Sequence, residues 1–118
     1  KKNLNKYTIF SDDNLSEAIK KINSNPCKTL IVIKKNKVLG TFSEGDLVRA
    51  LVKNTNLFSL VSDHMTTEFK FINKFDKDKI IKFFLKYNIS LIPICNKKFE
   101  LLDIIIVYDF LNKIIKNF

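Results

Sequence analysis

The sequence predicts an α/β fold in which one β-α-β-β-α unit occurs twice along the 118 residues. The continuous apolar, β-branched run at 30–33 is typical of a strand covered on both faces, and the segment 89–95 is its counterpart later in the chain. Apolar residues at helical spacing follow potential capping residues near 14 and again near 76. The order of these elements repeats at an offset of about 62 residues, which indicates two stacked copies of one supersecondary unit. Because a copy of under about 60 residues buries little surface alone, we expect the two copies to pack together through their sheets.

The first copy is expected to begin with a short strand at 7–10, followed by an amphipathic helix. Asn14 and Glu17 have the spacing of a capping box. The apolar positions that follow lie at i, i+3, i+4 and i+7 of a helix: Leu15, Ala18, Ile19 and Ile22. Pro26 ends this helix, because the residue before a proline is disfavoured in helical geometry.

A hairpin and a second helix complete the first copy. Two strands, at 30–33 and 38–42, are expected to be joined by a polar turn. A helix then begins at Ser43, and the residues expected to face the core are Leu47, Ala50 and Leu51. The segment 57–66 is too apolar for a free tether, so we expect it to pack across the domain.

The second copy follows the same plan. A strand is expected at 70–73 and a helix at 76–87, whose core face is formed by Ile80, Ile81, Phe84 and Leu85. The remaining elements are strands at 89–95 and 101–106 and a helix at 108–116. Phenylalanines in this half follow helix and strand periods, which favours core or dimer contacts over a surface on which bases stack.

The charge of +9 raises the question of a nucleic-acid partner. Lysines are spread through the chain, and arginine, which recognises phosphate and base edges bidentately, is represented only by Arg49. We therefore interpret the lysines as a solvated surface that still favours an anionic small ligand, and expect no nucleic-acid partner. Apolar runs fall short of the roughly 20 residues of a membrane helix, and no signal core follows the N-terminus, so no membrane partner is expected.

The cysteines and the histidine exclude the common metal sites. Cys27 and Cys95 lie far apart, no CxxC occurs, and His64 is the only histidine, so a zinc or iron–sulfur site lacks ligands. We interpret both cysteines as small buried thiols in a reducing, cytoplasmic compartment, with a disulfide as the alternative. His64 has no nucleophile or acidic partner in the pattern, which favours a surface or packing role over a catalytic base.

A family resemblance emerges from three runs: VLGTFSEGDLVRAL at 38–51, VSDHMT at 61–66 and IPI at 92–94. Together they resemble a tandem pair of cystathionine β-synthase (CBS) domains, the Bateman module, over nearly the whole chain. The resemblance implies two CBS repeats, at 1–60 and 61–118, packed through their sheets with pseudo-two-fold symmetry. It also implies binding of an adenosine-type nucleotide between the repeats.

The family pattern Gly-apolar-apolar-Ser/Thr-x-x-Asp/Asn is matched by Gly40, Ser43 and Asp46, with Thr41 departing from it. The resemblance assigns Asp46 to the ribose hydroxyls and Ser43 to the phosphate. A helix N-terminus favours an anion, and a carboxylate can accept from two hydroxyls at once. Arg49, one helical turn after Asp46, could reach the phosphate. The full candidate set for nucleotide binding is Ile9, Lys28, Thr29, Ser43, Asp46, Arg49, Pro93 and Asp109.

Two alternatives remain at this site. Ser43 and Asp46 also have the spacing of a helix cap, which would account for both residues without a ligand. In the second copy, Asp103 and Ile106 stand in place of Gly40 and Ser43, so an empty or altered second site is expected even though Asp109 aligns with Asp46. Because the second copy keeps its hydrophobic frame without Gly and Ser, we expect that the fold does not require them in the first.

The resemblance favours a regulatory module that senses a ligand. No paired carboxylates, nucleophile–base pair or metal cluster is evident, so we expect the module not to be an enzyme and to need no cofactor, with AMP, ADP or ATP as possible ligand. The run GTFSEGDLVR at 40–49 is similar to CBS pairs attached to sugar-phosphate nucleotidyltransferases and sugar-phosphate isomerases, and LLDII at 101–105 is nearer the nucleotidyltransferase type. A homodimer is expected through the apolar face of the last helix: Phe110, Leu111, Ile114, Ile115 and Phe118. The alternative is a ligand-free dimerisation or scaffold module.

Overall fold

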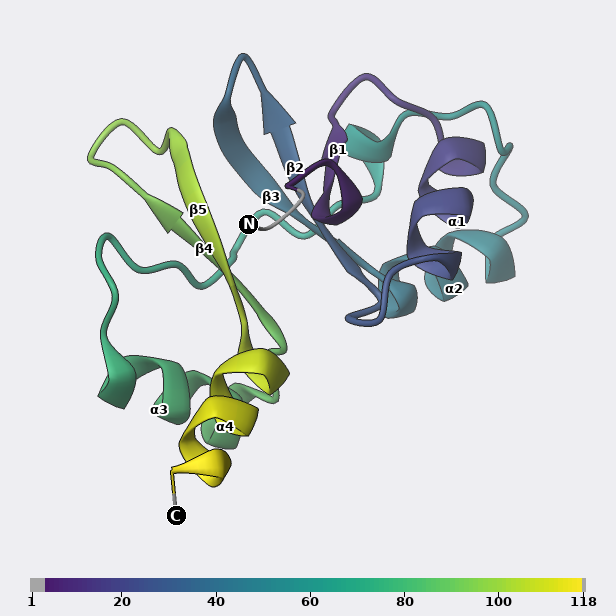
Figure 1. Cartoon of the computed structure of the whole chain (residues 1–118). Coiled ribbons are helices and arrows are strands. Elements are labelled where there is room, and N and C mark those ends of the chain that lie inside the picture. Colours follow the sequence, from purple (N-terminus) through teal and green to yellow (C-terminus); the bar gives the residue numbers. More distant parts are fainter. Residues whose placement is uncertain (1–3, 118) are drawn as a thin grey trace. The chain divides into compact units, whose positions relative to one another are not determined.

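The computed structural model describes residues 4–117, which form two compact units (Figure 1). The first unit ends at Phe69 and the second begins at Lys70. Both units contain strands and helices, so the predicted α/β class is confirmed. Each unit is described below by itself.

The first unit is a three-stranded sheet with two helices packed against one core. In the sheet, a central strand pairs in parallel with one neighbour and antiparallel with the other. The elements are the 3₁₀ helix η1 (Leu4–Tyr7), β1 (Thr8–Phe10), α1 (Leu15–Asn23), β2 (Thr29–Lys34), β3 (Lys37–Ser43) and α2 (Glu44–Val52), with sheet order β1-β2-β3. Both helices contribute to a single buried cluster with Leu30, Val32 and Phe42 of the sheet, and Figure 1 shows them on one side of it.

Local capping explains where the two helices begin. The Asn14 side-chain oxygen accepts a hydrogen bond of 3.0 Å from the Glu17 amide, as its spacing predicted. In α2 the buried stripe consists of Asp46, Leu47 and Ala50. The prediction that Leu51 faces the core is wrong, since its side chain is 45% exposed at the edge of that stripe.

The segment after α2 folds back onto the first unit. It contains the short 3₁₀ helix η2 (Val61–Asp63), whose Val61 side chain is fully buried in the first core. Farther along, the backbones of Thr41 and Thr66 exchange two hydrogen bonds, of 2.9 and 2.8 Å. The predicted packing of 57–66 across the domain is therefore confirmed. By its contacts, the segment 61–69 belongs to the first compact unit. That the second repeat begins at 61 stays a prediction.

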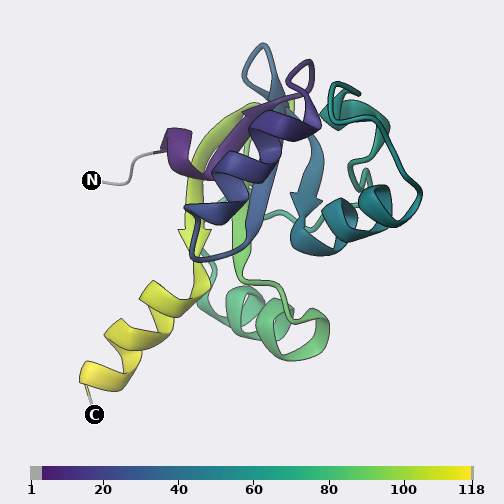
Figure 2. The same ribbon diagram turned by 90° about the vertical axis from the view of Figure 1, so that its right-hand side faces the viewer.

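The second unit consists of an antiparallel hairpin and two helices. Its elements are α3 (Lys77–Tyr87), β4 (Leu91–Cys95), β5 (Leu101–Ile106) and α4 (Val107–Lys116), which continues directly from β5 (Figure 2). The strand expected at 70–73 is reduced to one parallel bridge between Ile72 and Ile94. Leu85 does not face the core as predicted: it is 76% exposed, and Phe83 packs there instead.

The two hairpins share one irregularity at equivalent positions. In the first, Val32 pairs with Gly40 and the register shifts immediately after Val32. In the second, Ile94 pairs with Asp103 and the register shifts immediately after Ile94. Ile94 follows Val32 by 62 residues (94 − 32), and Asp103 follows Gly40 by 63 (103 − 40). This is the offset that the sequence predicts, with one extra residue in the second hairpin loop.

Candidate functional site

The candidate site is built around the start of α2, where β3 turns into the helix. Ser43 is the N-cap residue: its Oγ accepts a hydrogen bond of 3.2 Å from the Asp46 amide. In return, Asp46 Oδ2 accepts one of 2.9 Å from the Ser43 amide. The capping arrangement that the spacing allowed is therefore present, and it holds the Asp46 carboxylate in one orientation.

The Asp46 carboxylate is almost fully occupied by donors from its own chain. Besides the Ser43 amide, Oδ2 accepts from Ser43 Oγ at 3.1 Å. The other oxygen, Oδ1, accepts from Arg49 Nη2 and from Thr66 Oγ1, the latter at 3.0 Å. The residue is only 5% exposed. Since the two oxygens of a carboxylate offer about four acceptor sites, an incoming hydroxyl would have to replace one of these donors.

Gly40 is required by the segment that crosses β3. A Cβ at Gly40 would overlap the carbonyl oxygen of Thr66 and would lie 3.2 Å from Met65 Sδ. Backbone cannot move away as cheaply as the end of a side chain, so only glycine fits here. The expectation that the fold does not require Gly40 is therefore wrong, because only glycine admits Thr66 there. Ser43 has a structural role as the N-cap residue of α2.

Two further predicted residues lie beside the helix start. Thr29 pairs with Ser43 across β2 and β3. The carbonyl of Lys28 accepts a hydrogen bond of 3.0 Å from the Glu44 amide. The Lys28 ammonium donates to two carbonyls at the end of α1, each at 3.3 Å, so its charge is engaged there. The structure thus brings Lys28, Thr29, Ser43, Asp46 and Arg49 to one end of the first sheet.

The other three predicted residues lie elsewhere. Ile9 is 1% exposed, and its side chain packs in the first core. Pro93 is buried in β4, where it pairs with Ile104. Asp109 is exposed in the first turn of α4, whose N-cap residue, Ile106, makes no side-chain capping bond. The second copy therefore lacks the arrangement that orients Asp46.

A pocket of about 180 Å³ opens beside Asp46. One wall is α2 with its C-cap residue, and the other is the end of η2 with the residues that follow it. The lining residues are Asp46, Arg49, Ala50, Lys53, Asp63, His64 and Met65. His64 is half-buried, with its Nε2 3.2 Å from Ser59 Oγ. Our sequence reasoning placed no residue of 61–66 in the site, although the run VSDHMT was visible as part of the resemblance.

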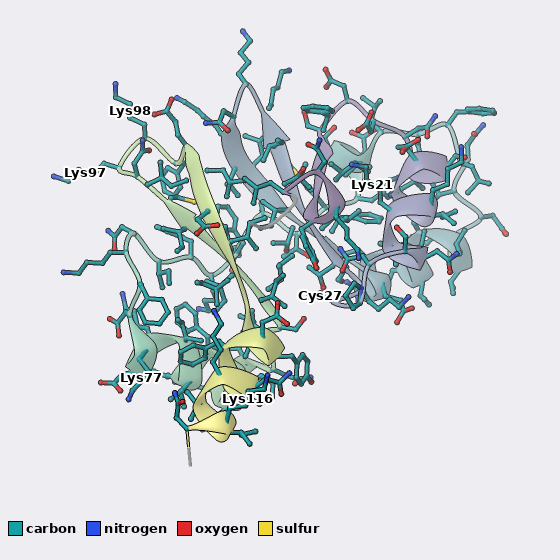
Figure 3. All side chains as sticks on the ribbon, in the orientation of Figure 1. Lys21, Cys27, Lys77, Lys97, Lys98 and Lys116 are labelled. Atoms are coloured by element: carbon teal, nitrogen blue, oxygen red, sulfur yellow. The ribbon has the colours of Figure 1, made fainter. Side chains whose placement is uncertain are left out.

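Lysines project from several separate elements. Those labelled in Figure 3 come from α1, α3, the β4–β5 loop and α4. Lys21 is partly engaged, since its ammonium donates to the carbonyls of Asn5 and Thr8, each at 2.8 Å. Between residues 4 and 117, no group of three or more His, Cys, Asp or Glu side chains is placed to hold a metal ion. No helix in this range is long and apolar enough to cross a membrane.

The two cysteines are present as thiols in different surroundings. Cys27 is half-buried, so its predicted burial is only partial. Cys95 lies in β4 and is fully buried. Burial raises the pKa of the Cys95 thiol to about 11, because an apolar environment disfavours the thiolate.

Comparison with known proteins supports the same fold. The family model "CBS domain" matches residues 3–53. No curated protein matches the chain. Among solved structures, a CBS-domain containing protein from Agrobacterium tumefaciens is 22% identical, with a TM-score of 0.72, over 91% of this chain and 87% of that one.

Two further solved structures carry adenosine compounds. A CBS domain protein from Pyrobaculum aerophilum, complexed with AMP, is 14% identical with a TM-score of 0.72, over 87% of this chain and 81% of that one. A CBS domain pair in complex with 5′-methylthioadenosine and S-adenosyl-L-methionine is 20% identical with a TM-score of 0.75, over 95% and 90% of the two chains. These likenesses confirm the predicted CBS-like α/β fold.

Proposed function

Because residues 3–53 match the CBS domain model, we propose that this chain is a regulatory module that binds an adenosine-type nucleotide and controls an attached or partner enzyme. The observation that carries the proposal is the Asp46 carboxylate, oriented by the capping box and placed on a pocket beside Arg49. A fixed acceptor next to a guanidinium suits a ligand that offers hydroxyls at one end and phosphate at the other.

In this proposal, Asp46 and Arg49 bind different parts of the nucleotide. Ribose hydroxyls donate to Asp46 Oδ1, the oxygen that the capping box leaves to outside donors. The phosphate pairs with Arg49, whose side chain is 67% exposed and so is accessible to an anion. The positive end of the α2 dipole adds to this attraction. Adenosine is common to the ligands of the two complexes described above, which supports a nucleotide of this class.

Control of an enzyme would work through differential affinity. A nucleotide that binds one arrangement of the module more tightly than another shifts the population toward it, and attached machinery responds to that shift. As in the sequence-based expectation, the controlled enzyme in this proposal is of the sugar-phosphate nucleotidyltransferase class.

A homodimer is also part of the proposal. Of the α4 face expected to form it, Phe110 and Leu111 pack against the second core, whereas Ile115 is 67% exposed. Phe118 lies outside the described residues. The exposed part of the face, rather than the whole of it, is thus available for a dimer contact.

Isothermal titration of the whole chain with AMP, ADP and ATP tests the proposal. We expect micromolar-range binding of one nucleotide, abolished by Asp46→Ala. Because that change also removes the capping box, Asp46→Asn, which keeps the size of the side chain, separates binding from folding. Asp78→Asn, at an exposed acid of α3, removes the same charge at another helix start and should leave binding unchanged.

One observation favours the alternative function, a ligand-free scaffold. The acceptor sites of Asp46 are filled by the chain itself, so the residue already has a structural role. Absence of binding by any adenine or guanine nucleotide at millimolar concentration would leave the scaffold as the better account.

A further inference from the structure

Asp46 Oδ1 is the oxygen at which a ligand and the chain would compete. The other oxygen of the carboxylate, Oδ2, accepts two hydrogen bonds from Ser43, one from its amide and one from its hydroxyl. The bond from the amide belongs to the capping box and would be lost only with the helix start. The hydroxyl that makes the other bond is held beside Oδ2, because the same Oγ caps the Asp46 amide. Oδ1 is held instead by two side chains from outside the cap, Arg49 and Thr66. A hydroxyl entering the site must therefore displace one of these two donors.

Thr66 is the donor more easily displaced. Its hydroxyl is neutral, whereas the Arg49 guanidinium makes a charge-assisted bond, and such bonds are roughly twice as strong as neutral ones. Replacing the threonine hydroxyl with a ribose hydroxyl exchanges one neutral O–H donor for another. Arg49 can then stay on Asp46 or turn its other N–H groups to a phosphate.

Thr66 is also fixed to the sheet through its backbone. Its amide and carbonyl pair with Thr41, and its carbonyl lies against Gly40. Met65 and His64, directly before it, line the pocket beside Asp46. The side chain that occupies Oδ1 is therefore part of the same segment that forms one wall of the pocket.

We infer that the Thr66 hydroxyl is a built-in competitor for the ribose position on Asp46, so that binding of a nucleoside removes the side-chain hydrogen bond that ties the 64–66 segment to Asp46. This inference rests on the proposed function and describes how binding at that site is regulated. The ligand class is a nucleoside with a free vicinal diol, because such a diol offers a neutral hydroxyl donor that can take the place of the Thr66 hydroxyl on Oδ1.

Thr66→Val tests the competition, because valine keeps the shape of threonine and lacks the donor. Titration of the whole chain with adenosine should show tighter binding by about two- to tenfold, the equivalent of one neutral hydrogen bond. Thr66→Ser keeps a hydroxyl and should bind as the wild type does. With 2′,3′-dideoxyadenosine, which lacks the diol, Thr66→Val should give no gain.

A second measurement needs no ligand. If the hydroxyl holds the segment, the Thr66 amide, which donates to Thr41, should exchange with solvent faster in Thr66→Val than in Thr66→Ser. Equal exchange rates in the two variants would overturn the coupling. Equal unfolding midpoints would show that both variants are folded.

The outcomes separate this inference from the proposed function. Binding by the wild type with weaker or unchanged binding by Thr66→Val overturns the competition and leaves the proposed function standing. No binding by the wild type or by either variant overturns both. Binding by Thr66→Val alone supports the competition, since the competitor would then mask the site in the wild type.

Discussion

The carbonyl oxygen of Thr66 occupies the position that a side chain on Gly40 would need. The two residues are held there by the pairing of Thr66 with Thr41, the neighbour of Gly40. A glycine that the family resemblance associates with a ligand site thus has a structural reason in this chain. The stability of the first unit should depend on it.

Gly40→Ala should destabilise the chain by about 1–3 kcal/mol, the usual cost of forcing extra atoms into a packed site. Urea unfolding followed by circular dichroism measures it. Gly45→Ala is the matched control: its Cβ would meet only ordinary contacts, the nearest at 3.5 Å to Arg49. Since alanine is favoured over glycine in a helix by roughly 0.5–1 kcal/mol, Gly45→Ala should be neutral or stabilising. Equal effects of the two changes would contradict the assigned role of Gly40.

Ser43→Ala should lower the free energy of unfolding by about 1 kcal/mol, because the Asp46 amide loses its capping acceptor. Ser43→Thr retains the hydroxyl and should recover most of the loss. The same urea titration checks both variants. A Ser43→Ala protein as stable as the wild type would show that the cap contributes little to α2.

Arg49→Gln should weaken binding of AMP more than binding of adenosine, because only AMP carries the phosphate assigned to the guanidinium. Stability should change by less than about 1 kcal/mol, since an ion pair with an exposed partner contributes little. Titration with the two ligands gives the ratio of affinities. Lys20→Gln, at an exposed position of α1, removes one positive charge elsewhere and should leave that ratio unchanged.

Cys95 should resist thiol reagents in the folded chain, and Cys27 should react faster. Full burial closes access to Cys95, and its raised pKa, about 11, keeps the thiol protonated. Labelling of Cys27→Ser and Cys95→Ala, each with one thiol left, followed by mass spectrometry, separates the two sites. Rapid labelling of Cys95 under native conditions would contradict the burial.

The raised pKa of the Cys95 thiol also predicts a pH dependence of stability. Above about pH 9 the unfolded chain releases the Cys95 proton, while the folded chain holds it until about pH 11. The unfolded state then binds fewer protons, so this group lowers the free energy of unfolding as the pH rises through that interval. Below it the contribution is constant. Unfolding of Cys95→Ala across the same range should show a shallower decline.

Much of the fold could be predicted because its signals are local. Capping residues, helical spacing and β-branched runs concern neighbours within a few positions, and these signals located the helices and the hairpin strands. The offset of 62 and 63 residues in the hairpins was likewise visible as a repeat. The solvent exposure of Leu51 and Leu85 could not be predicted from the sequence. Helical spacing identifies the apolar face of a helix, but only tertiary packing decides how much of that face is buried.

The candidate site divides in the same way. Ser43 and Asp46 are three residues apart, so their capping geometry could be inferred from the sequence. Thr66 lies 20 residues beyond Asp46, and no local pattern states that its hydroxyl reaches that carboxylate. The sequence by itself determined the capping pair and the start of α2, because both depend on contacts between residues a few positions apart. Which donors hold Asp46, and why residue 40 is glycine, was decided only when the chain folded back, because those contacts depend on how distant segments pack.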